Sequence, residues 1–149
     1  MMRLLYLGFR IYCFIFRPKT IGVRVMLIQN GQVLLVRQTY RPGWFIPGGG
    51  AKRGETLDQA ARREANEEIG AEMGKLNLLG VYTHFGEHKS DHNALFQCTD
   101  FSLNGKHDRE IAEARLFPLN ALPENLLPGH RQRLKEYRAG IEIPQFGEW

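Results

Sequence analysis

Three glutamates stand close together in the sequence: Glu64, Glu67 and Glu68. In a helix, their spacing of three and four residues places all three carboxylates on one face. Like charges this close repel one another unless a positive group lies among them. A hard divalent cation such as Mg²⁺ binds carboxylate oxygens together with phosphate oxygens and water, so the triplet indicates a metal site for phosphate chemistry. For the helix taken alone, a solvated acidic face is the alternative.

A glycine-rich loop at residues 48–54 precedes this helix. Because glycine lacks a Cβ atom, the loop backbone can approach a ligand closely and adopt conformations that other residues avoid. A loop carbonyl could complete the shell of a metal ion, and loop N–H groups could face a phosphate. Loop and helix together therefore favour a phosphate site more strongly than either segment does alone.

The elements that must position the loop and helix follow from periodicity and turn residues. Strands are expected at residues 21–29 and 32–39, joined by Asn30-Gly31, a pair that tolerates positive φ. Residues 40–54 are expected as loop, and residues 55–70 as a helix that ends at Gly70. The remaining expected elements are strands at 77–85, 93–101 and 111–117, a polar loop at 86–92 and a last helix at 129–139.

The expected order is two strands, a helix, three strands and a helix, which differs from the regular alternation of a doubly wound fold. It predicts an α/β protein of the α+β type, with a mixed β-sheet sandwiched between helices. A chain of 149 residues suits a single compact domain. We assign residues 19–149 to that domain and residues 1–18 to an added N-terminal amphipathic helix.

Residues 1–17 are mostly apolar and aromatic, with interrupting arginines. The apolar stretches are too short for a transmembrane helix, which needs about 20 apolar residues, and they lack a signal-peptide cleavage site. Arg3, Arg10 and Arg17 are seven residues apart, so they share a narrow band of a helix that Pro18 ends. Two uses stay open: packing on this domain or in a homodimer, and peripheral membrane contact with the arginines at anionic headgroups.

The composition excludes several classes of protein. The chain has 20 Lys+Arg and 16 Asp+Glu, and this modest net charge of +4 gives no strong nucleic-acid signal. Cys13 and Cys98 are far apart, so they indicate neither a zinc site nor a disulfide framework. Cys98 is expected to be a buried thiol. This pattern fits a cytoplasmic protein, with peripheral membrane attachment left open.

The loop and helix together resemble the signature of the Nudix hydrolase family, also described as MutT-like. That signature is G-x5-E-x7-R-E-U-x-E-E-x-G-U, where U is a bulky apolar residue. Its fixed positions are occupied here by Gly49, Glu55, Arg63, Glu64, Glu67, Glu68 and Gly70. Ala65 and Ala71 depart from the bulky U positions, which bears on packing and not on chemistry. Residues 43–49 and 114–119 resemble the family's approach to its loop and its late strand.

The resemblance implies a metal-dependent pyrophosphohydrolase that cleaves a nucleoside diphosphate linked to another moiety, with Mg²⁺ or Mn²⁺ as cofactor. The implied metal ligands are oxygen donors: the carboxylates of Glu64, Glu67 and Glu68 and the carbonyl of Gly48. Glu55 and Arg63 would pair and brace the loop against the helix. The alternative class is a non-catalytic Nudix-like module that binds nucleotides or partners. Such a module would be expected to lose the glutamates that this chain retains.

The general base stays open within this family pattern. Glu64 is one candidate, Glu110 ahead of the strand at 111–117 is a second, and Glu113 is a third. His88 and Asp91 lie in the expected loop at 86–92 and could reach a pocket.

The substrate contacts are also left open. One of Tyr40, Trp44 and Phe45 could stack on a nucleotide base, although Phe45 is expected in the core. Arg37 could meet a phosphate or pair with a neighbouring acid. A nucleoside triphosphate, an ADP-sugar, a dinucleoside polyphosphate and a capped RNA end all remain substrates consistent with the sequence.

Overall fold

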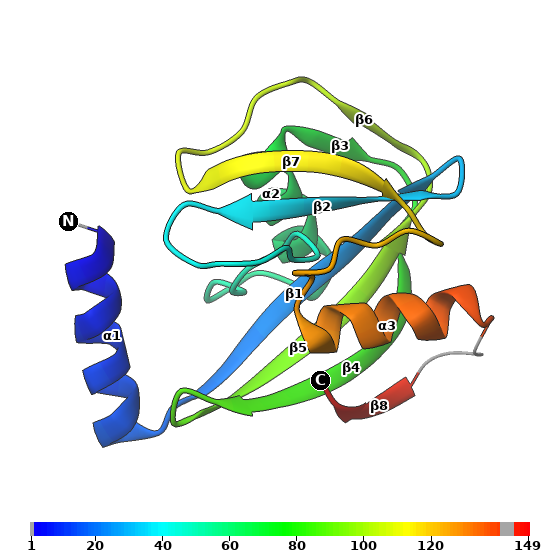
Figure 1. Cartoon of the computed structure of the whole chain (residues 1–149). Coiled ribbons are helices and arrows are strands. Elements are labelled where there is room, and N and C mark those ends of the chain that lie inside the picture. The colour runs from blue at the N-terminus through cyan, green and yellow to red at the C-terminus, as the bar shows by residue number, and fades with distance from the viewer. Residues whose placement is uncertain (1, 141–144) are drawn as a thin grey trace.

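A mixed β-sheet with helices on both faces forms the main body of this computed structural model, which describes residues 2–140 and 145–149 (Figure 1). Side chains are described from Leu4 onward, so that of Arg3 lies outside the described residues. The elements are α1 (Met2–Phe16), β1 (Lys19–Gln29), β2 (Gln32–Gln38), α2 (Leu57–Ile69), β3 (Ala71–Met73), β4 (Asn77–Gly86), β5 (Lys89–Cys98), β6 (Phe101–Leu103), β7 (Ile111–Pro118), α3 (Pro128–Arg138) and β8 (Gln145–Glu148).

The main sheet has the strand order β7-β2-β1-β5-β4-β8. Strand β1 runs parallel to β5, and β4 runs parallel to β8, whereas the other neighbours are antiparallel. Strands β3 and β6 form a separate two-stranded sheet. The predicted mixed sheet is therefore confirmed.

Both faces of strand β1 are buried, because its side chains alternate between two core clusters. Val23, Val25 and Leu27 pack on one face, where α2 contributes Ala60, Ala61, Ala65 and Ile69. Met26 and Ile28 pack on the other face, where α3 contributes Leu134. This alternation confirms the expected sandwich of the sheet between helices. Cys98 is fully buried in the first cluster, as predicted.

Helix α2 begins and ends at residues that satisfy its backbone. The Thr56 hydroxyl accepts from the Gln59 N–H at 3.2 Å, and the Gln59 side chain accepts from the Thr56 N–H at 2.9 Å. This capping box starts the helix at Leu57, slightly later than predicted. Gly70, in the left-handed conformation, ends it.

The loop at residues 39–56, which contains the glycine-rich residues 48–54, lies between β1 and β2. These two strands pair only beside their turn, at Ile28↔Val33 and Gln29↔Gln32. Beyond that point they diverge, and the loop bonds to both. The bonds, each 2.9 Å long, are Val36 N–H to Phe45 O, Phe45 N–H to Val36 O, Val25 N–H to Pro47 O, Val23 N–H to Gly49 O and Ala51 N–H to Ile21 O.

The predicted polar loop at residues 86–92 is wrong for most of its length. Only Glu87 and His88, both with positive φ, form the turn, and β5 already begins at Lys89. Residues 89–92 are extended because their backbone pairs with β1 on one side and β4 on the other. Asp91 therefore lies on a strand and not in a loop.

Three strands were missed, and each depends on pairing between distant segments. Strand β6 pairs with β3, so the predicted strand at 93–101 ends at Cys98 and a new one starts at Phe101. Strand β8 pairs with β4 near the C-terminus. Strands of three or four residues are too short to show a period in the sequence.

The predicted N-terminal helix is present as α1, and Figure 1 shows it standing beside the sheet. Arg17, with φ of 44°, and Pro18 connect it to β1. In the described part of the chain, no helix is long and apolar enough to cross a membrane.

We expect Gly48→Ala to destabilise the fold by about 3 kcal/mol. Gly48 has a φ of 146°, and a Cβ atom there would lie 2.0 Å from the Val23 carbonyl oxygen. The matched control is Gly50→Ala, because nothing lies within 4 Å of that Cβ position. Chemical unfolding should show a change within about 0.5 kcal/mol for the control. Equal losses in both variants would contradict the proposed fit of the loop.

Candidate functional site

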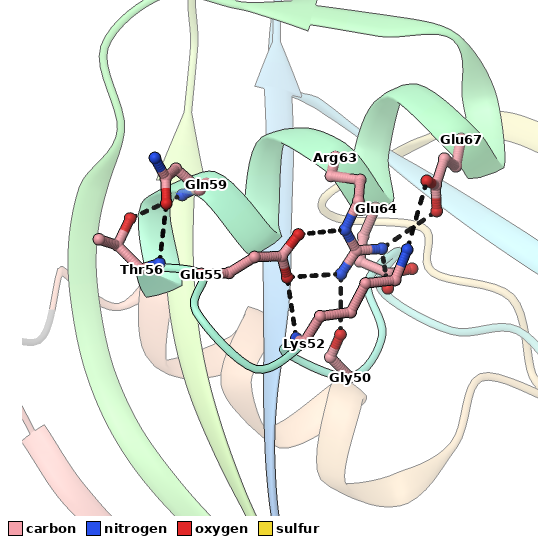
Figure 2. Close-up of polar contacts among 8 residues, drawn as sticks. All are labelled: Gly50, Lys52, Glu55, Thr56, Gln59, Arg63, Glu64 and Glu67. Atoms are coloured by element: carbon pink, nitrogen blue, oxygen red, sulfur yellow. Dashed lines mark hydrogen bonds and ion pairs between the residues drawn. The ribbon is translucent and has the colours of Figure 1, made fainter.

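Arg63 stands at the centre of an ionic cluster that joins α2 to the glycine loop (Figure 2). Its guanidinium donates to both oxygens of Glu55, at 2.6 and 2.9 Å. It also donates to Glu64 at 2.6 Å, to Glu67 at 3.0 Å and to the Gly50 carbonyl at 3.0 Å. One cation thus contacts three carboxylates and ties the helix to the loop.

The electrostatics of this cluster depend on those hydrogen bonds. The bonds from Arg63, together with the Lys52 N–H, lower the pKa of Glu55 to about 2. The same contacts, with Glu55 first, raise the pKa of Arg63. The ion pair between helix and loop therefore persists across the physiological range of pH.

Glu68 lies on the inner side of α2 and faces the loop backbone. Its carboxylate accepts from the Gly48 N–H at 2.9 Å. Burial raises the pKa of Glu68 to about 7, although the positive charge of Arg24 opposes this shift. Arg24, on β1, donates to the carbonyls of Ile46 at 3.2 Å and Gly48 at 3.0 Å. Gly48 is therefore held from both ends by charged side chains.

Gly49 leaves room for the carboxylate of Glu64. A Cβ atom on residue 49 would lie 2.4 Å from the nearer Glu64 carboxylate oxygen. Any larger residue would push that carboxylate away from the loop. The first glycine of the sequence signature is thus explained by close approach.

The glutamates fit a hard divalent cation by donor type but are not gathered around one point. Glu64 and Glu67 turn toward Arg63, whereas Glu68 turns toward Gly48. Within residues 2–140 and 145–149, no three His, Cys, Asp or Glu side chains are arranged to hold a metal ion. The donors are nevertheless all oxygens. The half-buried Glu68 carboxylate has a raised pKa even with the charge of Arg24 nearby, which indicates a deficit of positive charge around it. A cation near Glu68 would remove that deficit.

A cavity of about 280 Å³ adjoins Arg24 on the sheet. Its lining includes Arg24, Arg41, His84, Asp91, Asn93 and Trp149. Asn93 is buried, and Asp91 accepts from the Thr20 hydroxyl at 2.7 Å. Burial alone would raise the pKa of Asp91, but hydrogen bonds from Thr20 and the charge of Lys89 lower it overall. Cationic, amide and aromatic groups together suit an anionic ligand that carries a ring.

Sequence reasoning missed most of this cavity. Arg24 had a usable signal, because a charged residue interrupts an otherwise apolar strand there. Trp149 had none, since only the pairing of β8 with β4 and its contact with His130 place it at the site. His130 itself is buried, and its Nδ1 accepts from the Ile46 N–H at 3.0 Å.

Two of the predicted residues lie near Glu68. The negative charge of Glu110 contributes to raising the pKa of Glu68. After burial, the charges of Glu110 and Glu68 are the main causes that raise the pKa of Tyr40. Backbone bonds connect their segments to α2, because the Asp108 N–H donates to the Glu68 carbonyl at 3.4 Å and the Thr39 N–H donates to the Glu110 carbonyl at 2.9 Å.

Other predicted substrate contacts lie elsewhere. The predicted stacking of Trp44 on a base is wrong. Trp44 is buried in the core, where the Phe117 ring lies 4.8 Å away, so the Trp44 ring cannot stack on a base. Arg37 pairs with Glu113 at 2.9 Å, which is the alternative that the sequence left open. His88 contacts Phe14 of α1 edge to face at 4.9 Å. Phe45 is buried in the core, as predicted.

We expect Glu55→Gln to lower the melting temperature by a few degrees at neutral pH. The pKa of Glu55 falls from 4.5 to about 2 in the folded chain, so its ion pair stabilises the fold above pH 4.5. That contribution is lost as the pH falls toward about 2, where the two proteins should converge. Thermal unfolding over this range tests it, with the exposed Glu124→Gln as control. A difference in melting temperature between the wild type and Glu55→Gln that stays constant with pH would contradict the ion pair between Glu55 and Arg63.

A family model described as the NUDIX domain matches residues 18–137. The RNA pyrophosphohydrolase of Pseudomonas aeruginosa is 39% identical over 64 residues, which cover 43% of this chain and 39% of that protein. The match thus spans about two fifths of that relative's length. The ADP-ribose pyrophosphatase of Methanocaldococcus jannaschii is 30% identical over 122 residues, covering 78% of this chain and 72% of that protein.

Solved structures share the fold. A MutT NUDIX hydrolase from Burkholderia pseudomallei has a TM-score of 0.72 at 23% identity, covering 78% of this chain and 96% of that one. The MutT protein from Methanosarcina mazei Go1 has a TM-score of 0.72 at 23% identity, covering 85% and 99%. Arg63 joins three acids of the signature, Glu55, Glu64 and Glu67. Together with this arrangement, the family match and its relatives identify this chain as a member of the Nudix hydrolase family.

Proposed function

We propose that this chain hydrolyses the diphosphate linkage of a nucleoside diphosphate joined to another moiety. The observation that supports this most directly is the seating of the glycine loop against Glu64 and Glu68. The cavity at Arg24 and Arg41 adjoins this seat and offers positive charge for phosphate. The names of two relatives, RNA pyrophosphohydrolase and ADP-ribose pyrophosphatase, describe reactions of this class.

We assign Mg²⁺, or Mn²⁺ in its place, as the cofactor. Its proposed ligands are the carboxylates of Glu64, Glu67 and Glu68 and the carbonyl of Gly48. Such an ion, when bound, would polarise phosphoryl oxygens and lower the pKa of the attacking water. Arg63 holds Glu64 and Glu67 on the same side of α2, so it would position two of these ligands.

Glu110 is our candidate for the general base. It is exposed to water, and its charge acts on Glu68. Glu113 is less suited, because its ion pairs with Arg37 and Arg115 lower its pKa and occupy both carboxylate oxygens. Asp91 accepts from Thr20 and lines the cavity, so we assign it to substrate binding. A non-catalytic binding module would not need the glutamates retained on α2.

We also propose that α1 contacts an anionic membrane surface. Leu4, Ile11 and Ile15 are exposed by 76, 55 and 63% on the helix side away from the sheet. Exposed Arg10 and Arg17 suit anionic headgroups at the edge of that apolar face. The 15-residue helix is about 22 Å long, shorter than a hydrocarbon core of about 30 Å, so it would lie in the interface. Pairing of two α1 helices in a homodimer is the competing outcome.

We expect Glu67→Gln to lower kcat by at least about 100-fold. The amide keeps the shape of the side chain but removes the charge that a metal ligand needs. A panel of nucleoside triphosphates, nucleotide sugars, dinucleoside polyphosphates and capped RNA would be assayed with Mg²⁺ and with Mn²⁺. Glu72→Gln, an exposed carboxylate on β3, serves as the control. Undiminished activity of Glu67→Gln would remove the metal assignment.

For the membrane contact, we expect wild type to co-sediment with phosphatidylserine-containing vesicles and less with neutral phosphatidylcholine vesicles. The triple substitution of Leu4, Ile11 and Ile15 by Ser should lower binding by about 100-fold, since each removes exposed apolar surface. Phe146→Ser removes a side chain of 88% exposure on β8 and should leave binding unchanged. Equal binding by all three proteins would remove the proposal, and concentration-dependent dimers lost in the triple variant would favour pairing.

A further inference from the structure

Helix α1 contacts two segments at one end of the sheet: the residues after β2 and the β4–β5 turn. The Tyr6 ring lies 6.3 Å from the ring of Tyr40, which follows β2. The Tyr6 hydroxyl donates to the Glu87 carboxylate in the β4–β5 turn. Figure 1 shows α1 running beside the sheet from the end of β2 toward that turn. The helix therefore bridges two segments that lie on opposite sides of β1 in the sheet order.

A groove of about 240 Å³ remains between α1 and the domain. Its lining is Leu5, Tyr6 and Phe9 from α1, with Tyr40 and Glu110 opposite. Backbone hydrogen bonds connect the Tyr40 and Glu110 wall to α2. The Asp108 N–H donates to the Glu68 carbonyl at 3.4 Å, and the Thr39 N–H donates to the Glu110 carbonyl at 2.9 Å. One wall of the groove is thus connected to the candidate catalytic glutamates of α2, and the other wall is the apolar side of α1.

The α1 wall offers almost nothing to a polar ligand. Leu5 and Phe9 have no hydrogen-bonding atoms in their side chains, and the Tyr6 hydroxyl already donates to Glu87. On the α1 side, a sugar or a second nucleotide would find no replacement for its hydrogen bonds to water, because the other polar groups of the groove lie on the Tyr40 and Glu110 side. An aliphatic chain would instead gain free energy from burial against Leu5 and Phe9.

We propose that the second moiety of the substrate is an aliphatic chain attached to the diphosphate, and that it lies in this groove. The proposal rests on the proposed function, with the diphosphate at the α2 glutamates and the nucleoside in the cavity at Arg24. The exposed apolar face of α1 lies on the same helix as the groove, so a chain could pass from a bilayer to the site without crossing water. The chain could be acyl-like and unbranched or prenyl and branched.

The test is the binding of methyl, hexyl and decyl diphosphate, measured by titration calorimetry below their micelle concentrations with Ca²⁺ present. We expect affinity to rise by up to about fourfold for each buried methylene, until the groove is full. Geranyl diphosphate, with as many carbons as the decyl compound, distinguishes a prenyl from an unbranched source by which of the two binds more tightly. Affinity that does not change with chain length in the wild type overturns the proposal.

Matched variants separate the groove from the outer face of α1. Leu5→Ser with Phe9→Ser should remove the dependence on chain length and leave methyl diphosphate binding unchanged. Leu4→Ser with Ile15→Ser, on the outward side of the same helix, should leave the dependence on chain length and the binding of methyl diphosphate unchanged. If both double variants lost the dependence on chain length equally, the alkyl chains would be adsorbing to the outer face of α1. That result would overturn the groove assignment. Circular dichroism verifies that each variant keeps its fold.

The outcomes also separate this proposal from the proposed function. Hydrolysis of soluble nucleoside diphosphates without any chain-length dependence would overturn the groove and leave the pyrophosphohydrolase intact. Chain-length dependence that is lost in the groove variant, without hydrolysis of any nucleotide, would overturn the proposed function and support the groove.

Discussion

The separation of β1 and β2 is the constraint on which the rest of the site depends. Two adjacent antiparallel strands would normally pair along their length, but here the pairing stops after the turn. The loop backbone takes the vacant hydrogen bonds of both strands, so it is as firmly held as a strand. Gly48 can occupy this place only because it lacks a Cβ atom facing the Val23 carbonyl. A loop held in this way can present its amides and carbonyls in fixed positions.

Positive charge is distributed unevenly among the carboxylates around the loop. Arg63 neutralises the outer carboxylates, and its bonds to Glu55 and to the Gly50 carbonyl connect helix and loop. The inner carboxylate, Glu68, is half-buried, and the Gly48 N–H and the charge of Arg24 offset part of the cost of that burial. The carboxylates bonded to Arg63 are thus already neutralised within the fold. Added positive charge would be most favourable at Glu68.

Helix α1 adds an apolar surface to a site that is otherwise polar. It contacts the domain through a few residues, among them Tyr6 and Phe14, while most of its large apolar side chains face outward. Monomeric proteins rarely leave so many apolar side chains exposed together, which supports the membrane contact that we propose for this surface. The same helix also lines the groove that contains Glu110. The exposed apolar face and the apolar groove wall therefore both belong to α1.

The sequence by itself determined the local features: the helix with its Thr56 cap and Gly70 end, the Asn30-Gly31 hairpin, the terminal helix α1 and the ionic residues of the signature. Each depends on residues near one another in the chain, where spacing translates directly into geometry. Tertiary structure alone decided that Asp91 lies on a strand, that Trp44 is buried, and that Trp149 lines a cavity. These positions depend on pairing between distant strands and on core packing, which leave no periodic trace in a short segment.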